Sequence, residues 1–211
     1  AYEVAVHDAV DAAYDNPEAR SVLDALVERV VDAGWSNALT AKLVALTMPG
    51  VPDVYQGSEL WEQSLVDPDN RRWVDFKLRR HSLASIRGGA RPVLTGGPGD
   101  HGLAKLLVTW AALTARRDRP ELFTSYAGLH ADGPAARHTL AFDRGGAITV
   151  ATRLPLGLAA TGGWGDTVLS LPDGAWVDLV SGREVTTDRP LLANLLATHP
   201  VALLVPHQEL A

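Results

Sequence analysis

The chain has 211 residues, of which 46% are hydrophobic and 21% charged, and its formal net charge is −6. This composition is ordinary for a globular protein with a core of its own, and the acidic balance gives no reason to expect a nucleic-acid partner. The absence of cysteine excludes disulfides and thiol chemistry and fits a cytoplasmic protein, while no apolar stretch approaches the roughly 20 residues that cross a membrane.

The first part of the chain, up to about residue 119, has its apolar residues at three- and four-residue spacing, which predicts helices. We expect one helix to end before Pro17 and a second to stop at Gly34 in the C-cap position. Ser36 or Asn37 then caps a third helix, which the Pro-Gly pair at 49–50 ends. Residues 51–55 are a short apolar stretch bounded by Pro and Gly, which predicts a buried strand.

Two further helices are predicted before residue 119. The first runs from 75 to 86, with Phe76 and Leu83 facing inward, and a long loop rich in Gly and Pro follows it. Asp100 can cap the second of these helices. Its strong apolar stripe consists of Leu103, Leu106, Leu107, Trp110 and Leu113.

After about residue 126 the apolar period changes to two, which predicts strands. The runs are "HTLAFDR", "GAITVATRL", "DTVLSLP", "AWVDLVSG" and "VALLVP". Five or more strands of this kind in about 85 residues predict a small antiparallel β-sandwich. The strand predicted at 51–55 cannot form a sheet of its own, so the helical part needs neighbours that the chain does not supply. We therefore expect two domains, at residues 1–125 and 126–211.

Most short catalytic motifs are missing. The sequence has no GxxxxGK[ST] phosphate loop, no HExxH pair and no GxSxG elbow. The loop "TGGPGDHG" resembles a glycine-rich anion cradle, but it lacks the Lys and Ser/Thr that complete one. The seven histidines are scattered, and we expect His138 and His199 at strand edges. No metal site and no cofactor are predicted.

The stretch "TMPGVPDVYQGSELWEQSLVDPDNRRWVDF", residues 47–76, concentrates charged and aromatic side chains. Carboxylates and guanidinium groups can hold vicinal sugar hydroxyls, and aromatic rings offer flat faces to a sugar ring. An Asp–Arg pair that only staples the loop, with the aromatic residues in the core, explains the same pattern. A pair of glycosidase carboxylates fits less well, because residues two apart on a Pro-containing turn rarely face one substrate. The candidate substrate-binding residues are Tyr55, Gln56, Glu59, Trp61, Asp67, Asp69, Arg71 and Arg72.

The motif "PGVPDVYQGSEL" resembles the eighth barrel strand of the α-amylase family of glycoside hydrolases, which often carries a PGxPxxYxGxE pattern there. "LVDPDNRRWVDF", "AGWSNALTAKLVALTMPG" and "RPELFTSYAGLHADG" are similar to the maltooligosyl trehalose synthases of that family. The resemblance runs in order from about residue 2 to 206. Trp73 departs from it, because the family usually has proline at that position.

The resemblance implies the C-terminal portion of a (β/α)8 barrel, with helices, strand 8 and helix 8, followed by the β-sandwich. These enzymes convert the reducing-end α-1,4 bond of a maltooligosaccharide into an α,α-1,1 bond by intramolecular transglucosylation, with a retaining mechanism. Their nucleophile, acid/base and third carboxylate follow barrel strands four, five and seven. The resemblance therefore implies an isomerase segment that has no catalytic carboxylate of its own and is inactive without the upstream barrel.

The resemblance also implies roles for the candidate residues. Tyr55, Gln56 and Glu59 would shape or brace the floor of the pocket. The charged residues of 67–72 would line the loop near the glucose units or lock that loop, and Trp61 would be either a stacking platform or a packing residue. The expected partners are the maltooligosaccharide and the missing N-terminal barrel portion of the same enzyme.

A different class of protein is the main alternative. The chain would then be an autonomous glucan-binding or interaction module, with a pair of surface aromatic residues on the β domain. Trp164 and Trp176 are the obvious candidates, although Trp176 alternates with Val177 and Leu179 in a way that favours burial. Hydrolytic α-amylase relatives are a third possibility within the enzyme class.

Overall fold

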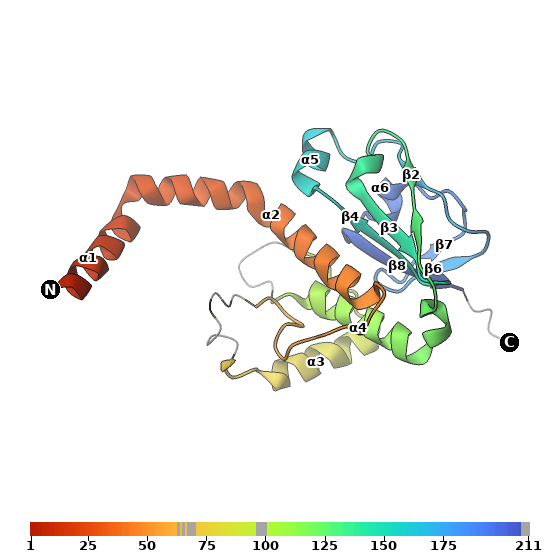
Figure 1. Cartoon of the computed structure of the whole chain (residues 1–211), viewed down its shortest axis with the longest axis horizontal. Helices are drawn as coiled ribbons and strands as arrows, with labels where there is room; N and C mark the ends of the chain where they lie inside the picture. Colours follow the sequence, from red (N-terminus) through yellow and green to blue (C-terminus); the bar gives the residue numbers. More distant parts are fainter. Residues whose placement is uncertain (63, 65, 67–70, 96–100, 208–211) are drawn as a thin grey trace.

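The computed structural model describes residues 1–62, 64, 66, 71–95 and 101–207. Four helices come first: α1 (Tyr2–Asp15), α2 (Pro17–Thr47), α3 (Phe76–Arg87) and α4 (Leu103–Asp118). Helix α1 and the first half of α2 form an arm that projects away from the rest of the molecule (Figure 1). No residue of α1 is buried. The remainder of α2 packs with α4 against a β domain.

Helix α2 is continuous, so the predicted break at Gly34 is wrong. Gly34 is not among the glycines with positive φ, which the predicted C-cap would require. Glycine inside a helix costs about 1 kcal/mol relative to alanine, and burial of the second half of the helix offsets that cost. The start of α2 is well capped, because Asn16 Oδ1 accepts hydrogen bonds from the backbone N–H groups of Glu18 and Ala19 at 2.9 and 3.1 Å.

Residues 51–55 do not form a strand in the structure, which corrects the prediction of a buried strand. The helix before them ends as expected, with Met48 as the C-cap. Val51 is 97% exposed and Tyr55 is half exposed. Among the described residues no strand lies beside this segment to accept its backbone hydrogen bonds.

Helices α3 and α4 lie where the periodicity predicts them. Asp75 caps α3 by accepting a hydrogen bond from Leu78 N at 2.9 Å. Phe76 is exposed, and Ser82 and Ile86 are the buried positions of this helix, so the predicted inward face is partly wrong. The cap of α4 is Gly102, and Asp100, which we expected there, lies outside the described residues.

The β domain contains a six-stranded antiparallel sheet in the order β1-β3-β4-β8-β6-β7 and a two-stranded sheet of β2 and β5. All five predicted runs contain a strand. The strands are β1 (Ala127–Leu129), β2 (Ala131–Asp132), β3 (Thr139–Asp143), β4 (Ile148–Thr152), β5 (Val168–Leu169), β6 (Trp176–Asp178), β7 (Glu184–Val185) and β8 (Val201–Pro206). The short helices η2 (Pro120–Phe123), η3 (Ala136–His138), α5 (Pro155–Ala160) and α6 (Leu192–Leu195) lie before and between them.

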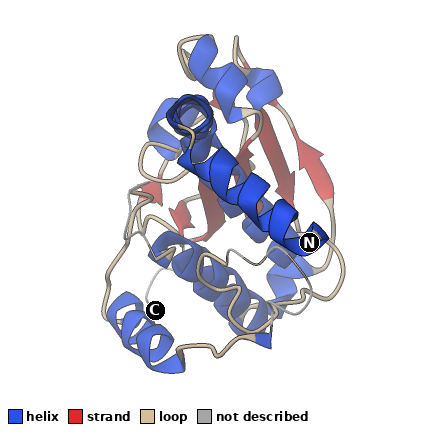
Figure 2. Ribbon diagram, turned by 90° about the vertical axis from the view of Figure 1, so that its left-hand side faces the viewer, coloured by secondary structure: helices blue, strands red, loops and turns tan. Residues whose placement is uncertain are grey.

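The larger sheet is buried on both faces. In β8, Leu203 and Val205 belong to the core cluster that includes residues of α2 and α4, while Ala202 and Leu204 belong to a second cluster with Leu192 of α6. Figure 2 shows the helices in front of the strands. The first cluster therefore continues across the boundary predicted at residues 125 and 126, and the division into two domains stays a prediction.

Candidate functional site

The segment 55–62 forms a turn that α3 braces. Arg79 of α3 donates from Nε to Glu59 Oε2 at 3.1 Å and from Nη2 to the carbonyl of Gly57 at 2.7 Å. Glu59 Oε2 also accepts from Gly57 N at 3.0 Å. Ser58 closes the turn with hydrogen bonds from N and Oγ to the carbonyl of Tyr55, at 3.0 and 2.7 Å. Because its carboxylate is held inside this network, Glu59 fixes the shape of the turn.

A cavity of about 260 Å³ opens beside this turn. It lies between the turn and the start of α3, and most of the residues that line it have polar or charged side chains. The residues that line it are Tyr55, Gln56, Ser58, Glu62, Arg72, Trp73, Val74, Asp75 and Arg79. Three of the predicted residues, Tyr55, Gln56 and Arg72, therefore share one cavity, and we call its wall the polar rim.

The other predicted residues lie in different surroundings. Arg71 is exposed and does not line the cavity. Asp67 and Asp69 lie outside the described residues. Trp61 packs on the helical core, with its ring 5.2 Å from that of Trp35 in α2, measured between centroids.

Two lysines lie behind the polar rim. Lys105 of α4 donates to the carbonyl of Leu60 at 3.0 Å, and its Nζ lies 5.5 Å from the centroid of the Trp61 ring. Lys42 of α2 contacts Ser58 Oγ at 3.5 Å. Burial lowers the pKa of both lysines, and for Lys105 the positive charge of Lys42 lowers it further, to about 8. The sequence spacing gave no sign of this cluster.

The lowered pKa of Lys105 predicts a pH dependence of stability. Its folded-state pKa is about 8 and its ordinary value is 10.5, so the unfolded chain binds more protons between these values. The free energy of unfolding is therefore expected to gain a favourable contribution as pH rises from 8 to 10.5, and to lose it as pH falls back. Urea unfolding across this range measures it. The rise should be smaller in Lys105→Met, where Lys42 still contributes, and persist in full in Lys77→Met, which removes an exposed lysine of α3. A profile of Lys105→Met identical to that of the unsubstituted chain would contradict the assignment.

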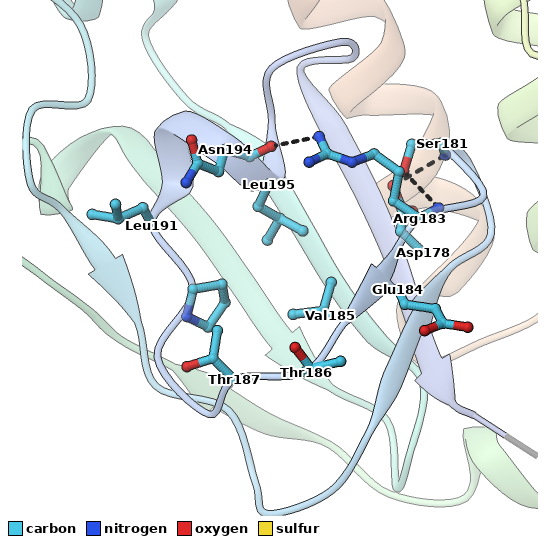
Figure 3. Close-up of a pocket in the computed structure, with 11 residues that line it drawn as sticks. Asp178, Ser181, Arg183, Glu184, Val185, Thr186, Thr187, Leu191, Asn194 and Leu195 are labelled. Carbon is cyan, nitrogen blue, oxygen red and sulfur yellow. Dashed lines mark hydrogen bonds between the residues drawn. The ribbon is translucent and has the colours of Figure 1, made fainter.

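A second cavity, of about 180 Å³, lies in the β domain between β7 and α6 (Figure 3). Arg183 spans its mouth and donates to the carbonyl of Asn194 at 3.1 Å. Asp178 is buried at one end and accepts hydrogen bonds from three backbone N–H groups and from Ser181 Oγ. Burial raises the pKa of Asp178, and these hydrogen bonds oppose the rise. The donors lie in the turn after β6 and in β8, so Asp178 holds this turn against the neighbouring strand.

The aromatic residues of the β domain give the alternative hypothesis little support. Trp176 is buried, as its spacing predicts, and donates from Nε1 to the carbonyl of Pro172 at 3.2 Å. Trp164 is partly buried and packs against the second core cluster. Among the described residues that line the cavity of Figure 3, none is aromatic. These two tryptophans therefore do not form an exposed sugar-binding pair.

The two histidines expected at strand edges are buried and hydrogen-bonded. His138 Nδ1 lies 3.1 Å from the carbonyl of Arg153, and its Nε2 accepts from Arg137 Nε at 3.1 Å. His199 Nε2 lies 2.9 Å from the carbonyl of Pro92. In the described ranges, no group of three or more His, Asp or Glu side chains is placed to hold a metal ion. None of the helices in the described part of the chain is long and apolar enough to span a bilayer.

Two arginines that the sequence analysis did not single out hold the backbone where α2 ends. Arg116 of α4 donates to the carbonyls of Leu46, Met48 and Gly50, at 3.2, 3.3 and 2.7 Å. Arg144, in the turn between β3 and β4, donates to the carbonyl of Thr47. Both contacts join residues more than 60 positions apart, so local sequence patterns carry no signal for them. They fix the point from which residues 51–62 depart towards the polar rim.

The arrangement is similar to that of solved maltooligosyl- and glycosyltrehalose synthases. Maltooligosyltrehalose synthase from Arthrobacter ramosus is 50% identical, with a TM-score of 0.87 over 94% of this chain and 26% of that protein. A structure described as DSM5389 glycosyltrehalose synthase is 25% identical, with a TM-score of 0.74 over 98% of this chain and 25% of that one. No protein-family model matches the chain.

The curated relatives lead to the same enzyme. Two proteins named "Putative maltooligosyl trehalose synthase", from two strains of Mycobacterium tuberculosis, are 46% identical over 208 residues, which is 97% of this chain. The match covers 25% of each relative, so the chain spans about a quarter of their length. The predicted resemblance to a portion of the maltooligosyl trehalose synthases is therefore confirmed over nearly the whole chain.

Proposed function

We propose that this chain is a segment of a maltooligosyl trehalose synthase, a cytoplasmic isomerase of the α-amylase family. The enzyme would convert the reducing-end α-1,4 bond of a maltooligosaccharide into an α,α-1,1 bond by intramolecular transglucosylation. The observation that carries the proposal is the 46% identity over 97% of the chain. It is supported by the structural match at 50% identity.

The chain would act together with the upstream part of a (β/α)8 barrel, which would supply the catalytic carboxylates. The arm supports this part of the proposal, because ten of its large apolar side chains are exposed and a stable surface of that kind normally faces a partner. They are Tyr2, Val4, Val6, Val10, Tyr14, Val22, Leu23, Leu26, Val27 and Val30. Residues 51–55 would become the eighth barrel strand when flanking strands pair with them, and residues 126–211 would be the β-sandwich that packs on the barrel.

The polar rim would contact the maltooligosaccharide. Tyr55, Gln56 and Arg72 line one cavity and present hydroxyl, amide and guanidinium groups that can hydrogen-bond sugar hydroxyls. Glu59 would act indirectly, because Arg79 already holds its carboxylate. For Trp61, the contacts with Trp35 and Lys105 favour packing over sugar stacking.

A product assay on maltopentaose tests the proposed function. Loss of reducing ends and formation of a non-reducing, trehalose-ended pentamer would be followed with this chain alone, with the upstream portion of the enzyme alone, and with both together. Activity that requires both chains is the expected result. Activity of this chain alone would overturn the assignment of the catalytic carboxylates to the upstream part. Inactivity of a folded, associated mixture would overturn the proposed reaction.

The same assay tests the polar rim with a matched pair of arginines. Arg72→Met should raise the KM of the mixture about tenfold, because a hydrogen bond from a charged donor to the sugar contributes roughly 1.5–3 kcal/mol. Arg80→Met, which removes an exposed arginine of α3 outside the cavity, should leave KM unchanged. Equal KM values for the two variants would remove Arg72 from the proposed substrate contacts.

A further inference from the structure

A groove of about 430 Å³ runs along α4 on the side of the molecule where β6 and β8 lie, apart from the polar rim. Its wall is mainly apolar. The apolar residues that form it are Trp110, Ala111, Ala115, Val177, Leu179 and Val205. Clefts of this size that expose apolar side chains usually mark a binding surface.

Two arginines that line this groove have incompletely satisfied guanidinium groups. Arg91 donates from Nη1 to the carbonyls of Ile86 and Ala90, at 3.4 and 3.1 Å, but its buried Nε has no hydrogen-bond partner among the described residues. Arg119 donates from Nη1 to the carbonyl of Pro206 at 3.2 Å. Its buried Nε lies 3.5 Å from Glu121 Oε1, which is an ion-pair contact without a hydrogen bond. Buried donors without acceptors are rare in native proteins, so Arg91 Nε points to a missing acceptor, while Arg119 has only a long contact with Glu121.

The spacing of the two arginines indicates an elongated occupant. Arg91 lies over the ring of Trp110, with its Cζ 6.0 Å from the ring centroid, and Arg119 is the C-cap of the same helix. Trp110 and Arg119 are nine positions apart along the helix, which corresponds to roughly 13 Å along its axis. A single small anion cannot reach both ends of the groove, whereas a peptide segment can.

The chemistry of the groove favours a protein segment over a glucan. Arg91 covers one face of Trp110, so that face is not available to stack on a sugar. The apolar wall would leave many hydroxyl groups of a glucan without hydrogen-bond partners. An apolar segment with an acidic side chain near Arg91 would fill the groove and pair with that guanidinium group. At the other end, Glu121 already contacts Arg119 and Asp118 also lines the groove, so no second acidic side chain is required there.

We propose that this groove docks an apolar, carboxylate-bearing segment from the rest of the same enzyme. The inference rests on the proposed function, which makes this chain one part of a longer protein. The relatives support it, because the chain matches only 25% of their length, which leaves three quarters of each relative to supply such a segment. The groove would then be a second interface, separate from the arm.

Cysteine labelling tests this interface without requiring activity. The chain has no native cysteine, so Thr114→Cys places one thiol in the groove and Ala193→Cys places a control thiol on the exposed surface of α6. The rate of maleimide labelling would be compared, by peptide mass, in the 211-residue chain and in the complete enzyme. The groove thiol should react at least tenfold more slowly in the complete enzyme, while the control thiol reacts equally in both. Equal rates for the groove thiol would overturn the proposal.

Two further labelling experiments identify the occupant of the groove. In the 211-residue chain, maltopentaose or inorganic phosphate should not slow labelling at Thr114→Cys, and protection by either would replace the protein segment with a small ligand. In the complete enzyme, Arg91→Met with Arg119→Met should restore labelling at least tenfold. Arg117→Met is the matched control, because Arg117 is exposed and already paired with Asp118 at 2.6 Å. Unchanged protection in the double variant would overturn the role of the two arginines.

The labelling result and the proposed function can fail separately. If the unsubstituted enzyme produces no trehalose-ended product but its groove thiol is protected from labelling, the proposed interface is supported and the proposed reaction is contradicted. If the enzyme is active and the groove thiol is not protected, the proposed reaction is supported and the proposed interface is contradicted.

Discussion

Replacing Arg144 by methionine is expected to lower the free energy of unfolding by about 3–5 kcal/mol. The Arg144 side chain belongs to a residue that is only 5% exposed, and its guanidinium donates to the carbonyls of Thr47, Phe123 and Ser125. Methionine fills much of the same space but donates nothing, so three carbonyls lose this donor in the folded state. The cost arises mainly from leaving the buried carbonyl of Thr47 and two partly buried carbonyls without this donor, rather than from lost packing.

A second arginine close in sequence provides the control for this prediction. Arg153 is exposed, and its side chain donates a hydrogen bond of ordinary length from Nη1 to the carbonyl of Arg137, at 3.1 Å. Arg153→Met should therefore change the free energy of unfolding by less than about 1 kcal/mol. Urea unfolding followed by circular dichroism measures both variants. Similar small losses in the two would show that the three carbonyls at Arg144 find other partners.

Arg144 also explains how the β domain influences the polar rim. Its bond to Thr47 is reinforced by Thr149 of β4, which donates from Oγ1 to Thr47 Oγ1 at 2.8 Å. On the other side, Arg116 binds the carbonyls that follow Thr47. The end of α2 is thus fixed to both α4 and the sheet, and the segment that leads to Tyr55 starts from a rigid point.

The sequence correctly predicted the elements that have long, regular apolar periodicity. The predictions were wrong where tertiary contacts determine the secondary structure. The strands of the β domain and helices α3 and α4 follow their apolar patterns. The break predicted at Gly34 did not occur, because one glycine costs less than the packing of the second half of α2 supplies. The strand predicted at 51–55 failed for the opposite reason, since a strand needs partners and this segment has none among the described residues.

The candidate site was predicted in part, because some of its residues form a local sequence motif and others come from distant parts of the chain. The motif around Tyr55 and Gln56 is local, so the resemblance identified it and the structure places both residues at one cavity. Arg79 and Lys105 hold the same turn from α3 and α4, but 20 and 45 residues separate them from their partners Glu59 and Leu60. The spacing of residues within a short stretch of sequence cannot reveal contacts between residues so far apart in the chain.

Substituting Gly102 by alanine is expected to destabilise the chain and displace Trp61. Gly102 has φ +80°, and a Cβ there would lie 2.5 Å from Trp61 N and 2.9 Å from Trp61 Cγ. Real side chains do not tolerate contacts with backbone this close, so the loop that carries Trp61 must move away from α4. The positive φ adds a penalty of about 1–2 kcal/mol, and the clash should bring the total loss of unfolding free energy to about 3 kcal/mol or more.

Gly89→Ala separates the clash from the backbone penalty. Gly89 has φ +102° but nothing lies within 4 Å of its Cβ position, so alanine there should cost only the conformational penalty. Urea unfolding gives the two losses, and the tryptophan emission of the folded chain reports on Trp61, whose ring contacts both Trp35 and Lys105. The emission should shift in Gly102→Ala and stay constant in Gly89→Ala. Equal losses with unchanged emission would mean that the Trp61 loop yields without cost, and Lys105 could then not hold the turn of the polar rim through Leu60.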